Sequence, residues 1–343
     1  MNSSILLIYT GGTIGMKQDP ATGALKPFNF NQILQEVPEL RKFGCKIDTF
    51  SFEPPIDSSD VQVGFWIEIA ELIEQNYHNY DGFVVLHGTD TMSYSASALS
   101  FMLENLTKPV IFTGSQLPIG MLRTDGKENL ISSIEIAAAR DNNGKAIVPE
   151  VCVYFESQLY RGNRTTKYNA ENFRAFRSAN FPVLADIGIH IRYNDSLIIR
   201  SPEENQFKIH TNLDTSVAIL KIFPGITEEF IKSFLSIKNI KAIILETYGS
   251  GNAPTSEWFI EALKEAINRE IIILNVTQCH AGKVDMEAYS TGIILKEIGV
   301  VSGYDSTTEA ALTKLFFLLG QENEIQNVKK RLSENLRGEI TIN

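Results

Sequence analysis

The sequence predicts an α/β protein with a larger N-terminal domain, in which helices flank a mostly parallel sheet, and a smaller C-terminal α/β domain. In the first half of the chain, apolar and β-branched segments alternate with segments of helical periodicity, which is typical of parallel α/β sheets. Several of the apolar segments stop at glycine-bearing loops, as buried central strands do. A polar stretch of weak periodicity then precedes a second, shorter alternation of strands and helices.

The pattern divides the chain into three parts. Its 343 residues are enough for two domains of ordinary size. We expect residues 1–192 to form the N-terminal α/β domain that carries the candidate site, 193–214 to form a linker, and 215–343 to form the C-terminal α/β domain. The linker assignment rests on the polar residues of this stretch, on Pro202 and on its lack of periodicity.

Each expected strand is a short apolar run, and in each expected helix apolar residues recur every three to four positions. In the first domain we expect strands over Ile5–Tyr9, Lys46–Phe52, Phe83–Leu86, Val110–Thr113 and Val151–Phe155, and helices over Asn31–Leu40, around Trp66–Tyr77 and over Ser93–Glu104. In the second domain we expect strands over Val217–Ile222, Ala242–Glu246 and Ile271–Val276, and helices over Glu228–Leu235, Glu257–Ile267, Thr307–Leu319 and Glu322–Asn335. Asp60 is the expected N-cap of the helix that contains Trp66.

Composition and charge exclude several classes of protein. A hydrophobic content of 43% with 21% charged residues is typical of a soluble globular protein, and a net charge of −10 argues against a nucleic-acid partner. No apolar segment approaches the about 20 residues that span a bilayer, and the N-terminus lacks the features of a signal peptide. Because Cys45, Cys152 and Cys279 form no C-x-x-C pair and the five histidines show no ligand spacing, we expect a cytoplasmic protein without metal or disulfide.

The stretch Ile5–Met16, ILLIYTGGTIGM, reads as a buried strand followed by a glycine-rich loop that carries Thr13. Ligands of open α/β sheets bind beyond the carboxyl ends of the strands, which is where this loop lies. The spacing of its glycines does not match the G-x-G-x-x-G pattern of nucleotide-binding turns. Two interpretations remain: a tight turn with a structural hydroxyl, or a threonine nucleophile, which needs a base to activate it.

The stretch Asp81–Met92, DGFVVLHGTDTM, repeats this design, with Thr89 and Asp90 after a second buried strand. Taken alone, these two residues would be interpreted as helix N-caps. Their position at the same sheet edge as Thr13 favours a role in a site. The cations Arg161, Arg164 and Lys167 follow a further strand, and we expect one of them to point into that site, where a lysine beside a carboxylate can relay protons.

An ordered set of motifs closely resembles the bacterial L-asparaginase family, in particular its cytoplasmic type I branch. The motifs are TGGTIG near the N-terminus, DSSD at 57–60, HGTDTM at 87–92, YRGNRTTK at 160–167, and then YGSGNAP, TQCHAGKV and NLRGEIT. The resemblance runs along essentially the whole chain. It implies the larger and smaller α/β domains described above, and an amidohydrolase that converts asparagine to aspartate and ammonia without a cofactor.

The resemblance also implies roles for single residues. Thr13 matches the nucleophile of the family, and Thr89, Asp90 and Lys167 match a set that polarises the reacting centre. The substrate-binding residues that it implies are Asp57, Ser58, Ser59, Gly88, Thr89 and Asp90. These residue types suit the reaction, because backbone N–H groups of a glycine-rich loop can stabilise an oxyanion, and ammonia must be protonated to leave.

The sequence departs from the family pattern at two places. Many members carry a tyrosine in the loop after the first motif, where this chain has Ala24 or Leu25, so Tyr289, a residue of another subunit or a different mode of activation takes its place. Type I enzymes can also bind asparagine at an activating site, which Thr166 and Cys279 match, but an arginine of that site is replaced by Glu246. This substitution reverses the charge that faces a carboxylate effector.

The sequence is also compatible with three other functions. One is a glutaminase-asparaginase, since a single methylene group discriminates by only about 1–3 kcal/mol in an apolar pocket. A second is the asparaginase-like subunit of a tRNA-dependent amidotransferase, which the absence of an added N-terminal domain and of a basic surface disfavours. A third, from another class, is a sensor that binds a small molecule without turnover. We expect L-asparagine as the substrate, glutamine as a weaker one, no nucleic-acid or membrane partner, and a homodimer or homotetramer.

Overall fold

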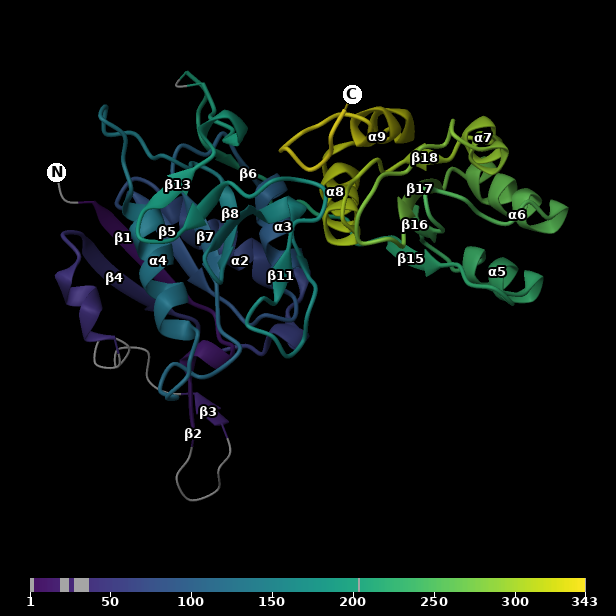
Figure 1. The fold of residues 1–343 in the computed structure, drawn as a ribbon. Coiled ribbons are helices and arrows are strands. Elements are labelled where there is room, and N and C mark those ends of the chain that lie inside the picture. Colours follow the sequence, from purple (N-terminus) through teal and green to yellow (C-terminus); the bar gives the residue numbers. More distant parts are fainter. Residues whose placement is uncertain (1–2, 19–24, 28–36, 203, 343) are drawn as a thin grey trace. The chain divides into compact units, whose positions relative to one another are not determined.

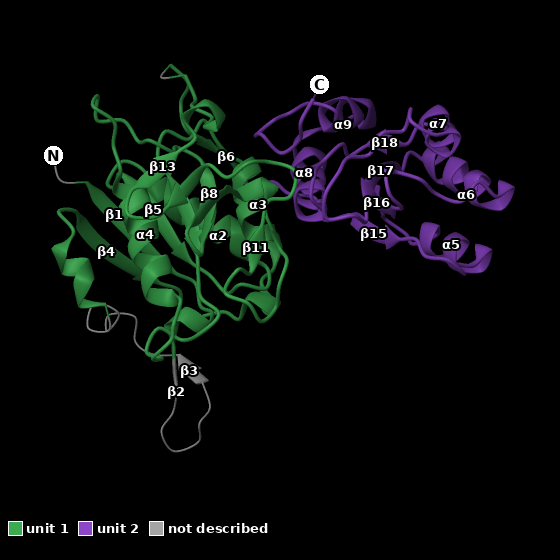
Figure 2. Cartoon of the chain, viewed as in Figure 1, with its two compact units in different colours: residues 1–211 green, residues 212–343 purple. Residues whose placement is uncertain are grey.

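The computed structural model describes residues 3–18, 25–27, 37–202 and 204–342. The chain separates into two compact units, residues 1–211 and 212–343 (Figure 2). Their boundary lies inside the range 193–214. Each unit has its own sheet and its own hydrophobic core, so each is described by itself below.

The first unit is built on an eight-stranded sheet in the order β13-β12-β9-β8-β7-β5-β1-β4 (Figure 1). Five strands are mutually parallel: β1 (Ser4–Tyr9), β4 (Lys46–Ser51), β5 (Gly82–Leu86), β7 (Val110–Thr113) and β8 (Val151–Phe155). The sheet continues antiparallel through β9 (Gln158–Arg161), β12 (Ala185–Ile187) and β13 (Ile191–Tyr193). The predicted α/β class with a mostly parallel sheet is confirmed, and all the parallel strands except β4 lie within buried apolar segments.

The described residues of this unit form the α-helices α2 (Val63–Asn76), α3 (Met92–Met102) and α4 (Gly126–Ala138). Successive residues of a strand point to opposite faces of the sheet. Ile5 and Leu7 of β1 share one buried cluster with Leu130 and Ile134 of α4, so α4 covers that face. On α2, Trp66 Nε1 donates a hydrogen bond of 2.9 Å to the side-chain oxygen of a serine on α3. This bond fixes α2 against α3.

The described residues of the first unit also form shorter elements. They are the 3₁₀ turns η1 (Thr13–Gly15), η3 (Pro38–Lys42), η4 (Ser58–Asp60), η5 (Gly162–Arg164) and η6 (Asp195–Leu197), and the short strand pairs β2 (Met16–Gln18) with β3 (Leu25–Pro27), β10 (Thr166–Lys167) with β11 (Phe176–Arg177), and β14 (Lys208–Ile209) with β6 (Leu103–Glu104). The predicted helix over Asn31–Leu40 lies mostly outside the described residues, and its described end belongs to η3. The predicted helix over Ser93–Glu104 ends at Met102.

One expectation for this unit was wrong, and one helix was not predicted. Asp60 does not cap α2, which begins at Val63 after Gln62 without a side-chain cap bond; Asp57 instead caps the preceding η4 turn. The helix α4 was not expected at all. Its buried positions include polar residues such as Asn129 and Ser133, so that the apolar periodicity of the segment is weak.

The second unit has a four-stranded parallel sheet in the order β15-β16-β17-β18. Its strands are β15 (Val217–Lys221), β16 (Ala242–Thr247), β17 (Ile272–Thr277) and β18 (Val301–Ser302), and its helices are α5 (Glu228–Leu235), α6 (Glu257–Asn268), α7 (Ser290–Glu297), α8 (Thr308–Gln321) and α9 (Ile325–Leu332). Thr227 and Thr307 accept hydrogen bonds from backbone N–H groups in the first turns of α5 and α8, which stabilises the starts of these helices. The elements β18 and α7 had not been predicted.

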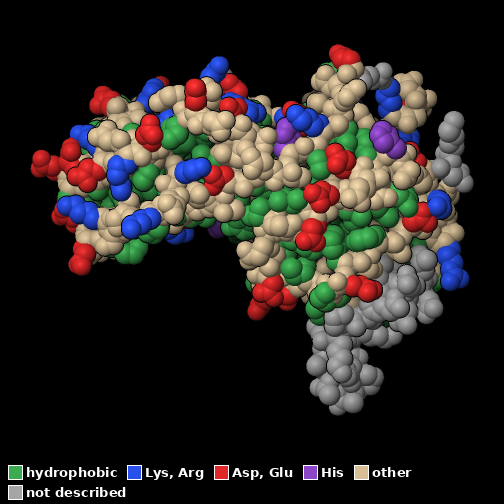
Figure 3. Space-filling view, turned by 180° about the vertical axis from the view of Figure 1, so that it is seen from behind, with side chains coloured by type: hydrophobic (Ala, Val, Ile, Leu, Met, Phe, Trp, Pro, Cys, Tyr) green, Lys and Arg blue, Asp and Glu red, His purple; other side chains and the backbone are tan. Residues whose placement is uncertain are grey.

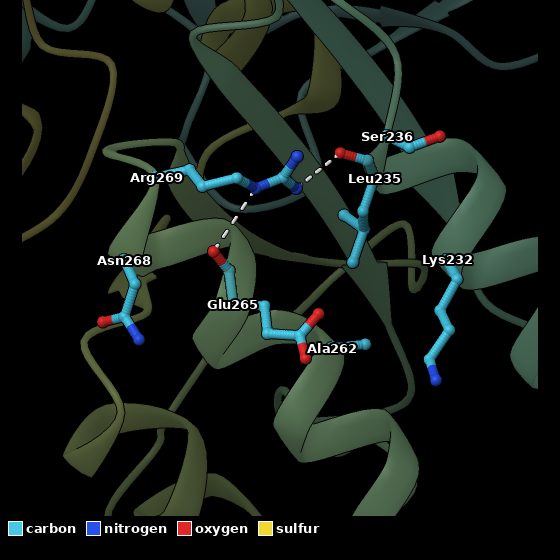
Figure 4. A pocket seen from close by; sticks show the side chains of 7 residues that line it. All are labelled: Lys232, Leu235, Ser236, Ala262, Glu265, Asn268 and Arg269. Atoms are coloured by element: carbon cyan, nitrogen blue, oxygen red, sulfur yellow. Dashed lines mark hydrogen bonds between the residues drawn. The ribbon is translucent and has the colours of Figure 1, made fainter.

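A pocket of about 480 Å³ lies on the second unit beside α5 and α6 (Figure 4). Arg269 Nη2 donates to the carbonyl of Leu235 at 2.7 Å, and Arg269 Nε donates to the carbonyl of Glu265 at 3.4 Å. The guanidinium therefore satisfies the last carbonyl groups of both helices, as basic side chains near helix C-termini do. All residues that line the pocket belong to α5, to α6 or to the residues directly after them.

Figure 3 shows acidic and basic side chains interspersed on the visible face of each unit, with hydrophobic side chains in several places between them. Over the described residues, none of the helices is both long enough and apolar enough to cross a membrane.

A buried ion pair ties the C-terminal segment to α8. Lys314 Nζ lies 2.6 Å from Glu339 Oε1, and their side chains are 4% and 0% exposed. Lys314 Nζ also donates to the carbonyls of Leu332 and Glu334, while Glu339 accepts N–H groups from the residues before it. Each charge thus has several partners, as buried charges require.

We expect Glu339→Ala to lower the free energy of unfolding by about 3–5 kcal/mol, because it leaves the Lys314 ammonium buried without its counter-charge. Urea denaturation of the purified protein measures this loss. The matched control is Glu261→Ala, which removes the carboxylate of the exposed Lys264–Glu261 pair and should cost less than about 1 kcal/mol. Equal losses in the two variants would contradict the structural role of the buried pair.

Candidate active site

Three loops of the first unit meet at a contact between backbones. A Cβ atom added to Gly12, whose φ is +86°, would lie 2.5 Å from the Cα of Gly88. A Cβ atom added to Gly88 would lie 2.5 Å from the hydroxyl oxygen of Ser58. Glycine is therefore required at both positions, and it brings the TGGT, DSSD and HGTD segments together.

Hydrogen bonds hold this contact in place. The backbone N–H of Ile56 donates to the carbonyl of Thr10 at 2.8 Å, and the Thr91 hydroxyl donates to the carbonyl of Ser58 at 2.6 Å. The strands β1 and β5, which precede two of the loops, are paired up to Tyr9 and Leu86 at their carboxyl ends. The loops therefore lie at the sheet edge where ligands of α/β proteins bind.

Lys167 joins two side chains of the HGTD segment. Its Nζ atom donates to Thr89 Oγ1 at 2.9 Å and to Asp90 Oδ1 at 2.6 Å. Lys167 is 18% exposed and Asp90 is 63% exposed, so the ammonium is largely covered while the carboxylate faces the solvent side. The N-cap of α3 is Thr91, and it forms no side-chain cap bond. Thr89 and Asp90 are therefore not the N-caps of this helix.

The other two cations of the YRGNRTTK segment have structural partners. Arg161 is buried and donates to Glu150 from Nε at 2.6 Å. Arg164 is also buried, and its guanidinium lies 5.0 Å from the centre of the Phe181 ring. Within the part of the chain that the structure describes, Lys167 is the cation of this segment that reaches Thr89 and Asp90.

Thr13 begins the η1 turn directly after Gly12 and is partly buried. The backbones of Gly12 and Gly88 are in contact. Thr13 directly follows Gly12 and Thr89 directly follows Gly88, so each threonine is the next residue after this contact. Positive φ angles at Gly11 and Gly12 turn the chain there. The structure thus brings the two hydroxyl-bearing loops to one place.

The DSSD loop places its side chains in two directions. Ser58 is buried against Gly88, whereas Asp57 and Ser59 are exposed. Asp57 Oδ1 accepts the backbone N–H and the hydroxyl of Ser59, both at 2.9 Å. These bonds, led by the backbone one, hold the pKa of Asp57 below its usual value, so Asp57 is a carboxylate at neutral pH.

The candidate effector residues belong to different units, and Tyr289, the expected substitute for the loop tyrosine, belongs to the second unit. Thr166 lies in β10 of the first unit, whereas Cys279 follows β17 in the second unit and is exposed. Glu246 Oε1 accepts the hydroxyl of Thr308 at 2.7 Å. Tyr289 is exposed in the second unit, and position 24 lies outside the described residues.

Sequence reasoning missed Gln116, which touches Thr89. Thr89 Oγ1 donates to Gln116 Oε1 at 3.3 Å. Its position in GSQLP, directly after the third strand that ends at this sheet edge, could have indicated that Gln116 lies at the site. Over the described residues, no group of three or more His, Cys, Asp or Glu side chains lies close enough together to hold a metal ion.

His87 supports the HGTD loop from inside the core. Its Nε2 atom lies 2.9 Å from Ser95 Oγ, which accepts a bond from Trp66 Nε1, and its Nδ1 atom lies 2.7 Å from the carbonyl of Gly88. Since the carbonyl can only accept, Nδ1 carries a hydrogen. Burial lowers the pKa of His87 to about 4.

Two family models match the chain. The model described as "Asparaginase, N-terminal" matches residues 4–199, and the model described as "Glutaminase/Asparaginase C-terminal domain" matches residues 216–332.

Similar proteins cover the chain along nearly its whole length. L-asparaginase 1 of Escherichia coli strain K12 is 44% identical over an alignment of 348 positions that covers 98% of each chain. A 60 kDa lysophospholipase of Mus musculus is 39% identical over 98% of this chain and 62% of its own length. The crystal structure of L-asparaginase I from Vibrio cholerae O1 biovar eltor has a TM-score of 0.90, with 41% identity and full coverage of both chains.

We expect protonation of His87 to destabilise the fold as the pH falls from about 6.5 to about 4. The unfolded chain takes up this proton first, because the pKa of His87 is lower in the folded state than in the unfolded state. The stability contribution is therefore complete above pH 6.5 and is lost through this window, with a total of about 3 kcal/mol.

Chemical denaturation at pH 7 and pH 4 measures the effect as the difference between the wild type and His87→Gln, which has no imidazole at this position. The wild type should lose about 3 kcal/mol more than the variant between the two pH values. His78→Gln, which changes an exposed histidine, should behave like the wild type. The same pH dependence in His87→Gln and the wild type would show that His87 is not the destabilising group.

Proposed function

The chain belongs to the asparaginase family, and we propose how its residues carry out the hydrolysis of L-asparagine to L-aspartate and ammonia. The chain is an amidohydrolase with L-asparagine as its substrate. The observation that carries the proposed mechanism is the bridge from Lys167 Nζ to Thr89 Oγ1 and Asp90 Oδ1.

In the first half of the reaction, the Thr13 hydroxyl oxygen attacks the carbon of the substrate carboxamide, and its proton passes to solvent water, from which the released ammonia takes it up as ammonium. A C–O bond forms, and the negative charge that develops on the carbonyl oxygen is stabilised by backbone N–H groups of the glycine-rich loops. Thr89 gives its proton to the leaving nitrogen and takes one from Lys167, at 2.9 Å. The C–N bond then breaks and ammonia leaves, with the acyl group attached to Thr13.

In the second half, water hydrolyses this ester. Lys167, now neutral, accepts a proton from the water through Thr89, and the acyl–oxygen bond breaks to release aspartate and restore Thr13. Asp90 supports the relay because its carboxylate, 2.6 Å from Lys167 Nζ, keeps the lysine beside Thr89. The mechanism uses side chains, backbone N–H groups and water.

We assign the two ends of the amino acid to the exposed carboxylates and the N–H groups of the same loops. Asp57 and Asp90 are negatively charged and suit the α-ammonium group of the substrate. Ser58 and Gly88 lie at the meeting point of the three loops, and Ser59 follows Ser58; we assign the α-carboxylate to their hydroxyl and N–H donors. Glutamine is the proposed weaker substrate, because one added methylene group is discriminated only modestly.

The proposal extends to the setting of the enzyme. We propose a homodimer or homotetramer and a reducing, cytoplasmic location; the three free thiols, of which Cys279 is exposed, fit the latter. Thr166 and Cys279 remain the proposed effector residues. Glu246 stands in place of an arginine and reverses the charge that would face the carboxylate of an asparagine effector. A sigmoidal dependence of the rate on asparagine would show that activation survives this substitution.

Ammonia release from the purified protein, measured over a wide range of asparagine and glutamine concentrations, tests the proposal. Lys167→Met should abolish turnover with an unchanged fold, because it removes the proton donor and acceptor of the relay. Thr13→Ala and Thr89→Val should also be inactive. The matched control is Lys264→Met, which removes an exposed lysine of α6 and should keep the wild-type rate.

Two results would contradict this assignment. If the wild type released ammonia from neither amide, the proposed reaction would be wrong. If Lys167→Met retained most of the wild-type rate, Lys167 would not be the relay group.

A further inference from the structure

The side chain of Gln116 lies between Thr89 and a loop after β10. Its Oε1 atom accepts the Thr89 hydroxyl at 3.3 Å. Its Nε2 atom donates to the carbonyls of Asn172 at 3.1 Å and Ala170 at 3.3 Å. Gln116 therefore connects a proposed relay residue to the backbone of the segment that follows Lys167.

These contacts allow one orientation of the Gln116 amide. Its nitrogen faces two carbonyl oxygens, which can only accept hydrogen bonds. A flipped amide would place Oε1 against both of them and would lose both bonds. The oxygen of Gln116 must therefore face Thr89.

The same reasoning defines the direction of the Thr89 hydroxyl. Lys167 has only hydrogens to donate, so it occupies a lone pair of Thr89 Oγ1. Gln116 Oε1 only accepts, so the single hydrogen of Thr89 points toward it. At 3.3 Å this bond is longer than the about 2.8 Å usual for O–H···O bonds, so it orients the hydrogen without holding it strongly.

Asp125, at the start of α4, holds the backbone of Gln116. Its two carboxylate oxygens accept the N–H of Gln116 at 3.1 and 3.0 Å, and Oδ1 also accepts the N–H of Leu117 at 3.1 Å. Such charge-assisted bonds are stronger than neutral ones. The position of the carboxylate at the N-terminus of α4 is also favourable for the helix dipole.

Asn129, one turn along α4, completes the support. It is buried, and its Nδ2 atom donates to the carbonyl of Gly114 at 2.9 Å and to Asp125 Oδ2 at 3.3 Å. Its Oδ1 atom accepts the N–H of Glu156 in the turn after β8 at 3.2 Å. Through Asp125 and Asn129, α4 fixes the 114–117 loop at both of its ends.

We propose that Gln116 is a positioning residue: it holds the Thr89 hydrogen away from Lys167, so that a lone pair of Thr89 Oγ1 faces the Lys167 ammonium, and the hydrogen turns from Gln116 to the leaving nitrogen during the reaction. Asp125 acts on the reaction through Gln116. This proposal rests on the relay role of Thr89 and Lys167 proposed above. Neither residue contacts the reacting atoms. They determine how often the relay has the geometry that the proton transfer needs.

The kinetics of Gln116→Leu test the first half of the proposal. We expect kcat to fall about tenfold, as part of the about 10²–10⁴-fold effect of positioned acid–base groups is lost. KM should stay within about threefold of the wild type, because substrate-binding groups are untouched. The control is Gln321→Leu, which removes an amide that donates to a backbone carbonyl at 2.9 Å in the second unit and should leave kcat unchanged. An unchanged kcat in Gln116→Leu would overturn the proposal.

A double-mutant cycle tests the second half. Asp125→Asn alone should lower kcat, whereas in the Gln116→Leu background it should change kcat by less than about twofold, since the residue through which it acts is already gone. The matched control is Asp141→Asn, whose carboxylate also accepts two backbone N–H groups, at 2.8 and 2.9 Å, in an exposed turn. If the fold-decrease in kcat of the double variant equalled the product of the two single fold-decreases, Asp125 would not act through Gln116.

A measurement that needs no turnover separates this proposal from the proposed function. Methyl-labelled threonine reports the side-chain rotamers of Thr89 by NMR. We expect one rotamer in the wild type and averaging between rotamers in Gln116→Leu and Asp125→Asn. A single unchanged rotamer in both variants would overturn the positioning role even if the protein released no ammonia, whereas a failure of the proposed function would appear as an inactive wild type.

Discussion

Three loops of the first unit approach one another so closely that a single added carbon atom on Gly12 or Gly88 would push them apart. The rest of the site depends on this contact. It places the first threonine motif against the second, and the second against Ser58 of the DSSD loop. The adjacent parallel strands β1 and β5 supply the two motifs at matching ends, so the sheet provides the coarse position and the glycines provide the final approach.

Lys167 reaches this place by a different route. The sheet changes from parallel to antiparallel between β8 and β9, and the chain then passes along α3. Gly162 permits this passage, because a Cβ atom there would lie 3.1 Å from the carbonyl oxygen and 3.2 Å from the Cβ of Ala96 on α3. The chain thereby returns to the start of α3, where Thr89 and Asp90 lie. A cation far from the other motifs in sequence is thus held within hydrogen-bond distance of both.

Polar side chains inside the core hold the loops of the candidate site through hydrogen bonds to their backbone. His87 joins α2 and α3 to the carbonyl of Gly88 through Ser95, and Asn129 and Asp125 join α4 to the loop that carries Gln116. Buried polar groups are stable when each has a partner, and such networks then make a position rigid. The helices on the sheet therefore do more than cover the core, since several of their buried polar residues hold loops of the site.

The sequence by itself determined the α/β class, the parallel strands, and the residues that the family resemblance implies at Thr13, Thr89, Asp90 and Lys167, because apolar runs, glycine-bearing loops and ordered motifs are local signals. The resemblance to the asparaginase family is confirmed by the similar proteins. Only the tertiary structure showed that Lys167 donates to both Thr89 and Asp90, that Asp57 caps its own loop while Asp60 caps no helix, and that Gln116 touches Thr89. These facts depend on contacts between residues distant in sequence. The helix α4 was not predicted, because its buried polar residues weaken the apolar periodicity that identifies a helix in a sequence.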